Sequence, residues 1–160
     1  MSCLPASSFA TACKPWASSK NLLTTPRGNP ILTEGKKRSN VEQARQRACW
    51  CAQVADENRG RDILVIDLHD LTPLVDFFVL VTGSSRRQMH GVADAVDQMM
   101  EEHGERRLGI EGYDASRWIL LDYGDLVIHV FDEEGRSFYG LEDLWADAPH
   151  VAWQETPLPR

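Results

Sequence analysis

The sequence predicts an α/β fold with a mixed sheet of about five strands, flanked by helices. A strand–helix–strand succession in the middle of the chain has a crossover of the length that implies a parallel pair of strands. Two later apolar segments are separated only by a tight turn at 123–124, so these two must run antiparallel. With 160 residues, of which 42% are hydrophobic, the chain can bury the core of one modest domain.

The first predicted helix begins near Ser39 and ends at Gly60. Either Asn40 with Gln43 or Ser39 with Glu42 forms a capping box at its start. Apolar side chains that recur at three- and four-residue steps follow, namely Val41, Ala44, Ala48, Cys51, Ala52 and Ala55. This spacing predicts an amphipathic helix.

Five short apolar segments are predicted to be strands: 62–68, 77–82, 108–111, 118–122 and 125–131. The first contains a continuous Ile-Leu-Val-Ile run, which indicates burial on both faces. Between the second and third strands, Ser85 with Gln88 caps a second helix, whose apolar face continues to Gly104.

Residues 1–38 differ in composition from the rest of the chain. They are rich in Ser, Thr, Pro and Lys, carry a single acid, Glu34, and show no sustained period, so we predict that they are disordered. The composition also fits an organelle transit peptide, while a nonfunctional bacterial extension or a start codon placed too far upstream explains it equally well. The folded domain is predicted over 39–151, followed by a flexible tail at 152–160.

Charge is divided unevenly along the chain. Residues 1–54 carry a net charge of +6 and residues 55–160 a net charge of −13. The acidic part argues against direct, sequence-specific nucleic-acid binding, which needs a basic footprint, whereas basic protein partners remain open. No apolar run approaches the roughly 18 residues of a membrane span, so no membrane association is expected.

Three groups of residues allow more than one chemical interpretation. Gly83, Ser84 and Ser85 open a helix after a strand, where they form either an anion site or an ordinary helix cap, which we favour. A metal site formed by the carboxylates and histidine at 67–70 is less favoured than the polar end of a strand, because no third ligand cluster follows. His129 lies within a strand, where a packed, hydrogen-bonded histidine is expected.

The segment 118–145 combines aromatic residues with many acids. Its seven carboxylates are opposed by one arginine of the same segment; they are Asp122, Asp125, Asp132, Glu133, Glu134, Glu142 and Asp143. Rigid aromatics and a field of one sign favour a docking face for a basic partner. The segment is predicted to form a tight hairpin followed by a short helix. The alternative to a docking face is a hairpin with one buried apolar face and one solvated acidic face.

From residue 62 to about residue 151 the chain resembles the ribosomal silencing factors, the RsfS or Iojap family. The segments that carry the resemblance, in the family's order and spacing, are DFFVLVTGSSRRQ at 76–88, ADAVD at 93–97, EG at 111–112, RWILLDYGDLVIHVF at 117–131 and RSFYGLEDLWADAP at 136–149. The sequence departs from the family at Arg86, where a small polar residue is usual. No counterpart of residues 1–38 exists in the family pattern.

The resemblance implies a fold related to a minimal nucleotidyltransferase, and binding to the large ribosomal subunit at ribosomal protein L-fourteen, a basic protein. Binding there blocks joining of the small subunit and represses translation, without catalysis or a cofactor. Carried over by position, the binding face contains Trp118, Leu120, Asp122, Tyr123 and Asp125. The resemblance also implies a possible homodimer and a cytoplasmic, ribosome-associated protein, or a plastid or mitochondrial one if residues 1–38 are a transit peptide.

A small nucleotidyltransferase-like enzyme is the alternative function. That chemistry needs two carboxylates spaced two positions apart on one strand, so that both hold Mg²⁺. The strands after Gly83 offer no such pair, since Asp122 and Asp125 are three positions apart and lie on either side of a turn.

Overall fold

The computed structural model describes residues 34–115 and 117–158; residues 1–33, most of the segment predicted to be disordered, lie outside the described range. The elements in chain order are α1 (Glu34–Glu57), β1 (Arg61–Asp67), β2 (Phe77–Thr82), α2 (Arg86–Glu102), β3 (Gly109–Glu111), β4 (Trp118–Asp122), β5 (Leu126–Phe131), α3 (Glu133–Tyr139), α4 (Leu141–Leu144) and a 3-10 helix η1 (Trp153–Glu155). The predicted α/β class is confirmed.

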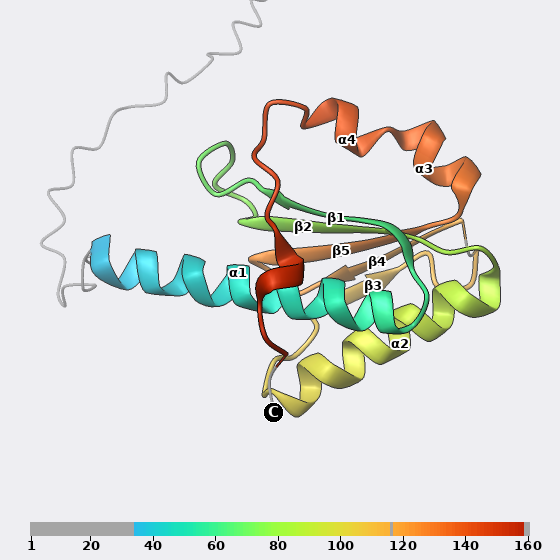
Figure 1. Cartoon of the computed structure of the whole chain (residues 1–160), viewed down its shortest axis with the longest axis horizontal. Coiled ribbons are helices and arrows are strands. Elements are labelled where there is room, and N and C mark those ends of the chain that lie inside the picture. The colour runs from blue at the N-terminus through green and yellow to red at the C-terminus, as the bar shows by residue number, and fades with distance from the viewer. Residues whose placement is uncertain (1–33, 116, 159–160) are drawn as a thin grey trace, which may run out of the picture. The chain divides into compact units, whose positions relative to one another are not determined.

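The mixed five-stranded sheet is also confirmed, with the strand order β1-β2-β5-β4-β3 (Figure 1). Strands β2 and β5 are the parallel pair, and all other neighbours are antiparallel. Helix α2 connects β2 to β3, yet β5 and β4 lie between these two strands. The crossover therefore gives β2 and β3 the same direction without pairing them, and the parallel partner of β2 comes from the later hairpin.

The two faces of the sheet are covered differently. Helices α1 and α2 pack against one face, and α3 with α4 lie over the other (Figure 1). Most of the core lies on the α1 and α2 side, where small side chains such as Ala44, Ala48 and Ala52 are fully buried. Fewer buried residues lie on the opposite face: Ile66, Leu68, Leu80, Phe131 and Ala148.

Helix α1 begins at Glu34, before the predicted start at Ser39. Ser39 and Asn40 lie within the helix, so the capping box does not mark its beginning. The Lys and Arg residues at 36–38 have good helix propensity, which is compatible with the earlier start. The helix ends close to Gly60, where a Cβ atom would lie 2.6 Å from Val81 Cγ1, so a side chain has no room there.

The chain after α4 returns to the sheet and then to α1. His150 forms an isolated bridge with Ile66 of β1, and η1 lies against α1, where the Gln53 side-chain amide donates to the carbonyl oxygen of Trp153 at 3.0 Å. The Trp50 indole N–H donates to the carbonyl oxygen of Pro157, also at 3.0 Å. Side chains of α1 therefore supply hydrogen-bond donors for the backbone of the described part of the tail predicted over 152–160.

Candidate functional site

Strand β4 places three of the five predicted contact residues on one face of the sheet. Ile119 and Leu121 are fully buried in the core beneath α1 and α2. Because successive strand side chains point to opposite faces, Trp118, Leu120 and Asp122 point to the other face, where each remains half-buried. We call these three residues the β4 triad.

An open hollow of about 420 Å³ lies beside the β4 triad, between strands β3 and β4 and helix α3. Its lining residues are Glu111, Gly112, Ala115, Arg117, Trp118, Leu120 and Tyr139. The hollow thus combines two aromatic and two aliphatic side chains with one residue of each charge. A large apolar side chain of a partner fits a site of this composition.

Aromatic rings surround Trp118 and hold it in place. Its ring lies 5.3 Å from the Phe131 ring in a stacked arrangement, and 4.5 Å from the tilted Tyr139 ring. Phe138, the neighbour of Tyr139 on α3, is 82% exposed and meets Tyr139 edge to face at 5.1 Å. Helix α3 therefore extends the aromatic surface beyond the hairpin, an extension that sequence reasoning missed although both residues belong to the aromatic segment 118–145.

His129 lies beneath this surface. It is 4% exposed, and its Nδ1 accepts a hydrogen bond of 3.1 Å from the Trp118 indole N–H. Burial lowers the pKa of His129 to about 4, so the ring is neutral at pH 7. With Nδ1 as acceptor, the ring proton is on Nε2, which has no hydrogen-bond partner within the described part of the chain. The expectation that His129 is packed is confirmed, and the expectation that it is hydrogen-bonded is confirmed for Nδ1.

The structure does not bring Tyr123 and Asp125 together with the β4 triad. Tyr123 is buried in the core on the α2 side, where its hydroxyl donates to Asp97 Oδ1 at 2.8 Å. Burial, together with this hydrogen bond, raises the pKa of Tyr123. Asp125 Oδ2 forms a 2.5 Å ion pair with Arg47 of α1. Position in the hairpin suggested a shared face, but the chain turns after Asp122 and directs both side chains toward the helices.

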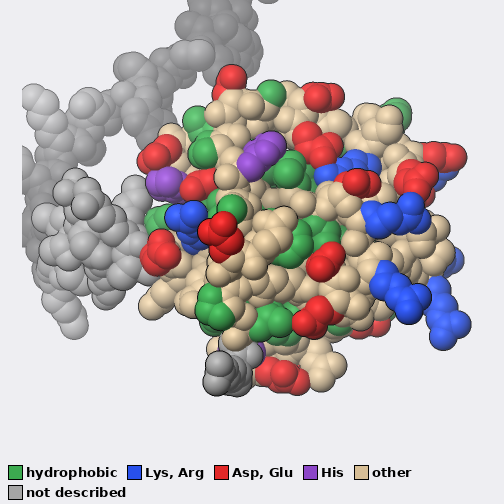
Figure 2. Space-filling view, in the orientation of Figure 1, with side chains coloured by type: hydrophobic (Ala, Val, Ile, Leu, Met, Phe, Trp, Pro, Cys, Tyr) green, Lys and Arg blue, Asp and Glu red, His purple; other side chains and the backbone are tan. Residues whose placement is uncertain are grey.

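In the folded protein, ion pairs partly neutralise the negative charge of the segment 118–145. Arginines outside the segment pair with its carboxylates: Arg47 with Asp125, Arg61 with Glu133 and Arg117 with Glu134. Figure 2 shows acidic side chains dispersed over the face in view, with most of the basic ones at the right of the view. Asp122 has no ion pair within the described residues; its Oδ1 accepts the backbone N–H of Gly124 at 2.8 Å. The β4 triad therefore retains a negative charge.

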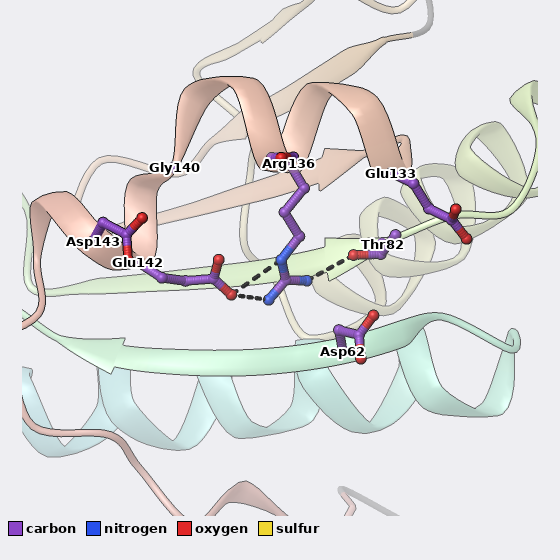
Figure 3. Close-up of a pocket in the computed structure, with 8 residues that line it drawn as sticks. Asp62, Thr82, Glu133, Arg136, Gly140, Glu142 and Asp143 are labelled. Carbon is purple, nitrogen blue, oxygen red and sulfur yellow. Dashed lines mark hydrogen bonds and ion pairs between the residues drawn. The ribbon is translucent and has the colours of Figure 1, made fainter.

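Arg136 joins α3 and α4 to the end of β2 in a second hollow of about 330 Å³ (Figure 3). It donates to Thr82 Oγ1 at 2.8 Å and to Glu142 Oε1 at 3.0 Å, and its side chain is only 13% exposed. Asp62, Glu133 and Asp143 also line the hollow (Figure 3). Since the guanidinium is already engaged by protein groups, we interpret Arg136 as the residue that fixes the helices over the sheet.

The residue groups at 83–85 and 67–70, which allowed more than one chemical interpretation, have structural roles. Ser85 is the N-cap of α2, with its Oγ 3.3 Å from the N–H of Gln88, as predicted. His69 contacts Asp67 at 2.5 Å and Asp70 at 3.1 Å through its two ring nitrogens. The hydrogen bond to Asp67 raises the pKa of His69. In the described residues, no group of three or more His, Cys, Asp or Glu is placed to hold a metal ion. None of the described helices combines the length and apolar character needed to cross a membrane.

Comparison with known proteins agrees with the fold and the motifs. The family model described as ribosomal silencing factor during starvation matches residues 41–159. Ribosomal silencing factor RsfS of Bacillus subtilis is 39% identical over 98 residues, which cover 61% of this chain and 83% of that protein. Protein Iojap, chloroplastic, of Arabidopsis thaliana is 35% identical over 103 residues, covering 62% and 42%. A crystal structure of a Chromobacterium violaceum protein matches with a TM-score of 0.62 at 31% identity, over 64% of this chain and 86% of that one.

The family match begins within α1 and includes the whole sheet, the β4 triad and the helices over both faces. The resemblance found from the motifs is thereby confirmed, and with it a role in translation regulation. The chain belongs to the family of ribosomal silencing factors.

Proposed function

We propose that this protein binds the large ribosomal subunit through ribosomal protein L-fourteen, blocks joining of the small subunit and so represses translation. Family membership supports the ribosome as the target. The observation that carries the choice of surface is the β4 triad, an aromatic, an aliphatic and an acidic side chain aligned on one face of a rigid strand.

The physical character of this face suits a basic protein partner. Trp118 is braced by Phe131 and Tyr139, so little side-chain entropy is lost when a partner packs on it. Leu120 adds apolar area beside the open hollow, and Asp122 supplies charge for a Lys or Arg of the partner. Tyr123 and Asp125 are left out of the proposed face because they serve the core and α1.

The central test is the Trp118→Ala variant. Truncation of a central aromatic anchor costs about 2 kcal/mol or more, which is roughly a 30-fold loss of affinity at every salt concentration. Cosedimentation with isolated large subunits on sucrose gradients measures this loss, and circular dichroism shows whether the variant is folded. Leu74→Ala is the matched control, because Leu74 is 84% exposed in the β1–β2 loop. Equal losses in the two variants would argue against the face.

Asp122→Asn tests the electrostatic part of the face. The amide oxygen retains an acceptor for the Gly124 N–H, so the turn is preserved while the charge is removed. We expect a lower association rate and a weaker dependence of binding on salt. Asp56→Asn makes the same charge change at an exposed position on α1 and should leave both quantities unchanged. Identical salt profiles for wild type and Asp122→Asn would remove Asp122 from the interface.

We further infer that the protein acts without catalysis or a cofactor. Asp122 and Asp125, which lie three positions apart around the hairpin turn, point to opposite sides of the hairpin, which is incompatible with a shared metal ion. Labelled-nucleotide incorporation in the presence of Mg²⁺ should stay at background. Incorporation that disappears in Asp122→Asn would instead favour the nucleotidyltransferase-like alternative.

We propose a cytoplasmic, ribosome-associated protein, with a plastid or a mitochondrion as the alternative if residues 1–38 are a transit peptide. The relative named as chloroplastic supports the alternative. Mass spectrometry of the mature N-terminus from the native source separates the two, because cleavage upstream of α1 indicates import. A homodimer through the β4 triad is also compatible with the exposed face, and it would be broken by the same Trp118→Ala substitution.

A further inference from the structure

We propose that His129 is a positioning residue for the binding face: it fixes the Trp118 indole in the orientation in which a partner meets it. The inference rests on the proposed function, because His129 can orient Trp118 for a partner only if Trp118 belongs to the binding face. It concerns the β5 side of the hairpin, which carries none of the proposed contact residues.

The strand register brings the two residues together. In the antiparallel pairing of β4 with β5, Trp118 lies opposite Phe131 and Leu120 lies opposite His129. Trp118 and His129 are therefore diagonal neighbours across the two strands, within reach of large side chains. The hydrogen bond from the Trp118 indole N–H to His129 Nδ1 spans this diagonal at 3.1 Å.

The His129 ring is itself held rigidly. It stacks on Phe131 with an interplanar angle of 7°, and Phe78 of β2 meets it edge to face at 4.7 Å. The half-buried indole thus donates its N–H to a ring that Phe131 and Phe78 hold in place. This contact gives the half-buried anchor a single defined orientation before any partner arrives.

Stability alone does not explain a histidine at this position. The Nε2–H group is buried and has no partner within the described part of the chain, which is unfavourable for folding. Phenylalanine would fill similar space among the same rings without this unsatisfied donor. The feature that phenylalanine lacks is the Nδ1 acceptor, and the group that uses this acceptor is the anchor of the proposed face.

Two variants separate positioning from packing. His129→Phe keeps the ring and removes the acceptor, whereas His129→Asn places an amide oxygen near the Nδ1 position and leaves part of the ring volume empty. We expect His129→Phe to melt at or above the wild-type temperature and to bind large subunits about 5-fold more weakly. His129→Asn should melt lower and, when measured below its melting temperature, bind close to wild type. A purely structural role predicts that binding follows stability in both variants.

Nuclear magnetic resonance of the full-length ¹⁵N-labelled protein tests the hydrogen bond without the ribosome. In the wild type, His129 should show an unprotonated Nδ1 and a protonated Nε2, and the Trp118 indole N–H should show a scalar coupling to Nδ1. Absence of the coupling would overturn the proposal, as would wild-type binding by folded His129→Phe. Failure of His129→Phe to fold would make the role one of packing and would also overturn it. Wild-type binding by Trp118→Ala would instead refute the proposed face, and the coupling observed in the wild-type protein would be unaffected by that result.

Discussion

The two faces of the β4–β5 hairpin carry similar residue types with opposite roles. On the face toward α1 and α2, Tyr123 and Asp125 bond to side chains of α2 and α1, and Leu121 is fully buried. On the other face, Trp118 and Asp122 remain accessible and bond only within the hairpin and its neighbouring rings. An aromatic and a carboxylate on the first face therefore stabilise the fold, while the same pair on the second face is available to a partner. Substitutions on the two faces should change different measured quantities.

The largest effect on folding is expected from Asp125→Lys. The Arg47–Asp125 pair is mostly shielded from water, and the substitution replaces it with two like charges. We expect the free energy of unfolding to fall by about 4 kcal/mol. Urea denaturation measures this loss, and Asp122→Asn, on the opposite face, should lose less than about 1 kcal/mol. If Asp125→Lys is as stable as wild type but fails to bind large subunits, the division between the faces is wrong.

Lowering the pH should weaken the fold through His129. Because its pKa is lowered to about 4 by burial, the unfolded chain takes up this proton first as the pH falls below 6.5. The free energy of unfolding of wild type, relative to His129→Phe, should therefore fall by about 3 kcal/mol between pH 6.5 and 4. His69 has a raised pKa and the opposite sign, but it is common to both chains and cancels. Parallel stability curves for the two proteins over this range would contradict the prediction.

Trp153→Ala should destabilise the fold by about 2 kcal/mol, since a partly buried tryptophan that packs on the core beside α1 is truncated. The position lies on the α1 and α2 side of the sheet, opposite the β4 triad, so binding to large subunits should not change. Thermal melting and cosedimentation of the same preparation check both statements. Loss of binding without loss of stability would show that the partner also contacts η1.

The smallest effect is expected for Tyr123→Phe, which removes one hydrogen bond to Asp97 and keeps the ring in the core. The free energy of unfolding should fall by about 1 kcal/mol, and affinity for large subunits should stay at the wild-type value. Trp118→Phe is the matching change on the other face and should reduce affinity while changing stability little. If Tyr123→Phe lost affinity and Trp118→Phe lost only stability, the partner would bind the face that carries Tyr123 instead.

Local patterns in the sequence predict most of the elements, and what they miss depends on distant contacts. Strands β2 and β4 and the cap at Ser85 agree with prediction because alternation and capping are properties of neighbouring residues. The pairing of β2 with β5 was not predicted, since the crossover through α2 suggests β3 as the partner. The hydrogen bonds that the carbonyls of Trp153 and Pro157 accept were not predicted for the same reason, because their donors lie on α1, about a hundred positions earlier.

The candidate site shows the same limit. Trp118, Leu120 and Asp122 follow from strand period alone, but the direction of Asp125 depends on Arg47, which no pattern in the hairpin reveals. The negative charge of segment 118–145 was overestimated because arginines from α1, β1 and the loop before β4 pair with its carboxylates. His129 was correctly expected to be packed, while its bond to Trp118 needed the strand register.

The return of the chain to β1 has a consequence for aggregation. An uncovered sheet edge is a template onto which another molecule can add a strand. Here Asp67 donates its backbone N–H to the carbonyl oxygen of Pro149, and the Val151 N–H donates to the carbonyl oxygen of Val65, each at 2.9 Å, so part of the β1 edge is already occupied. The opposite edge, β3, is only three residues long. Fibril-like growth through the sheet edges is therefore disfavoured, and specific association is left to the faces of the domain.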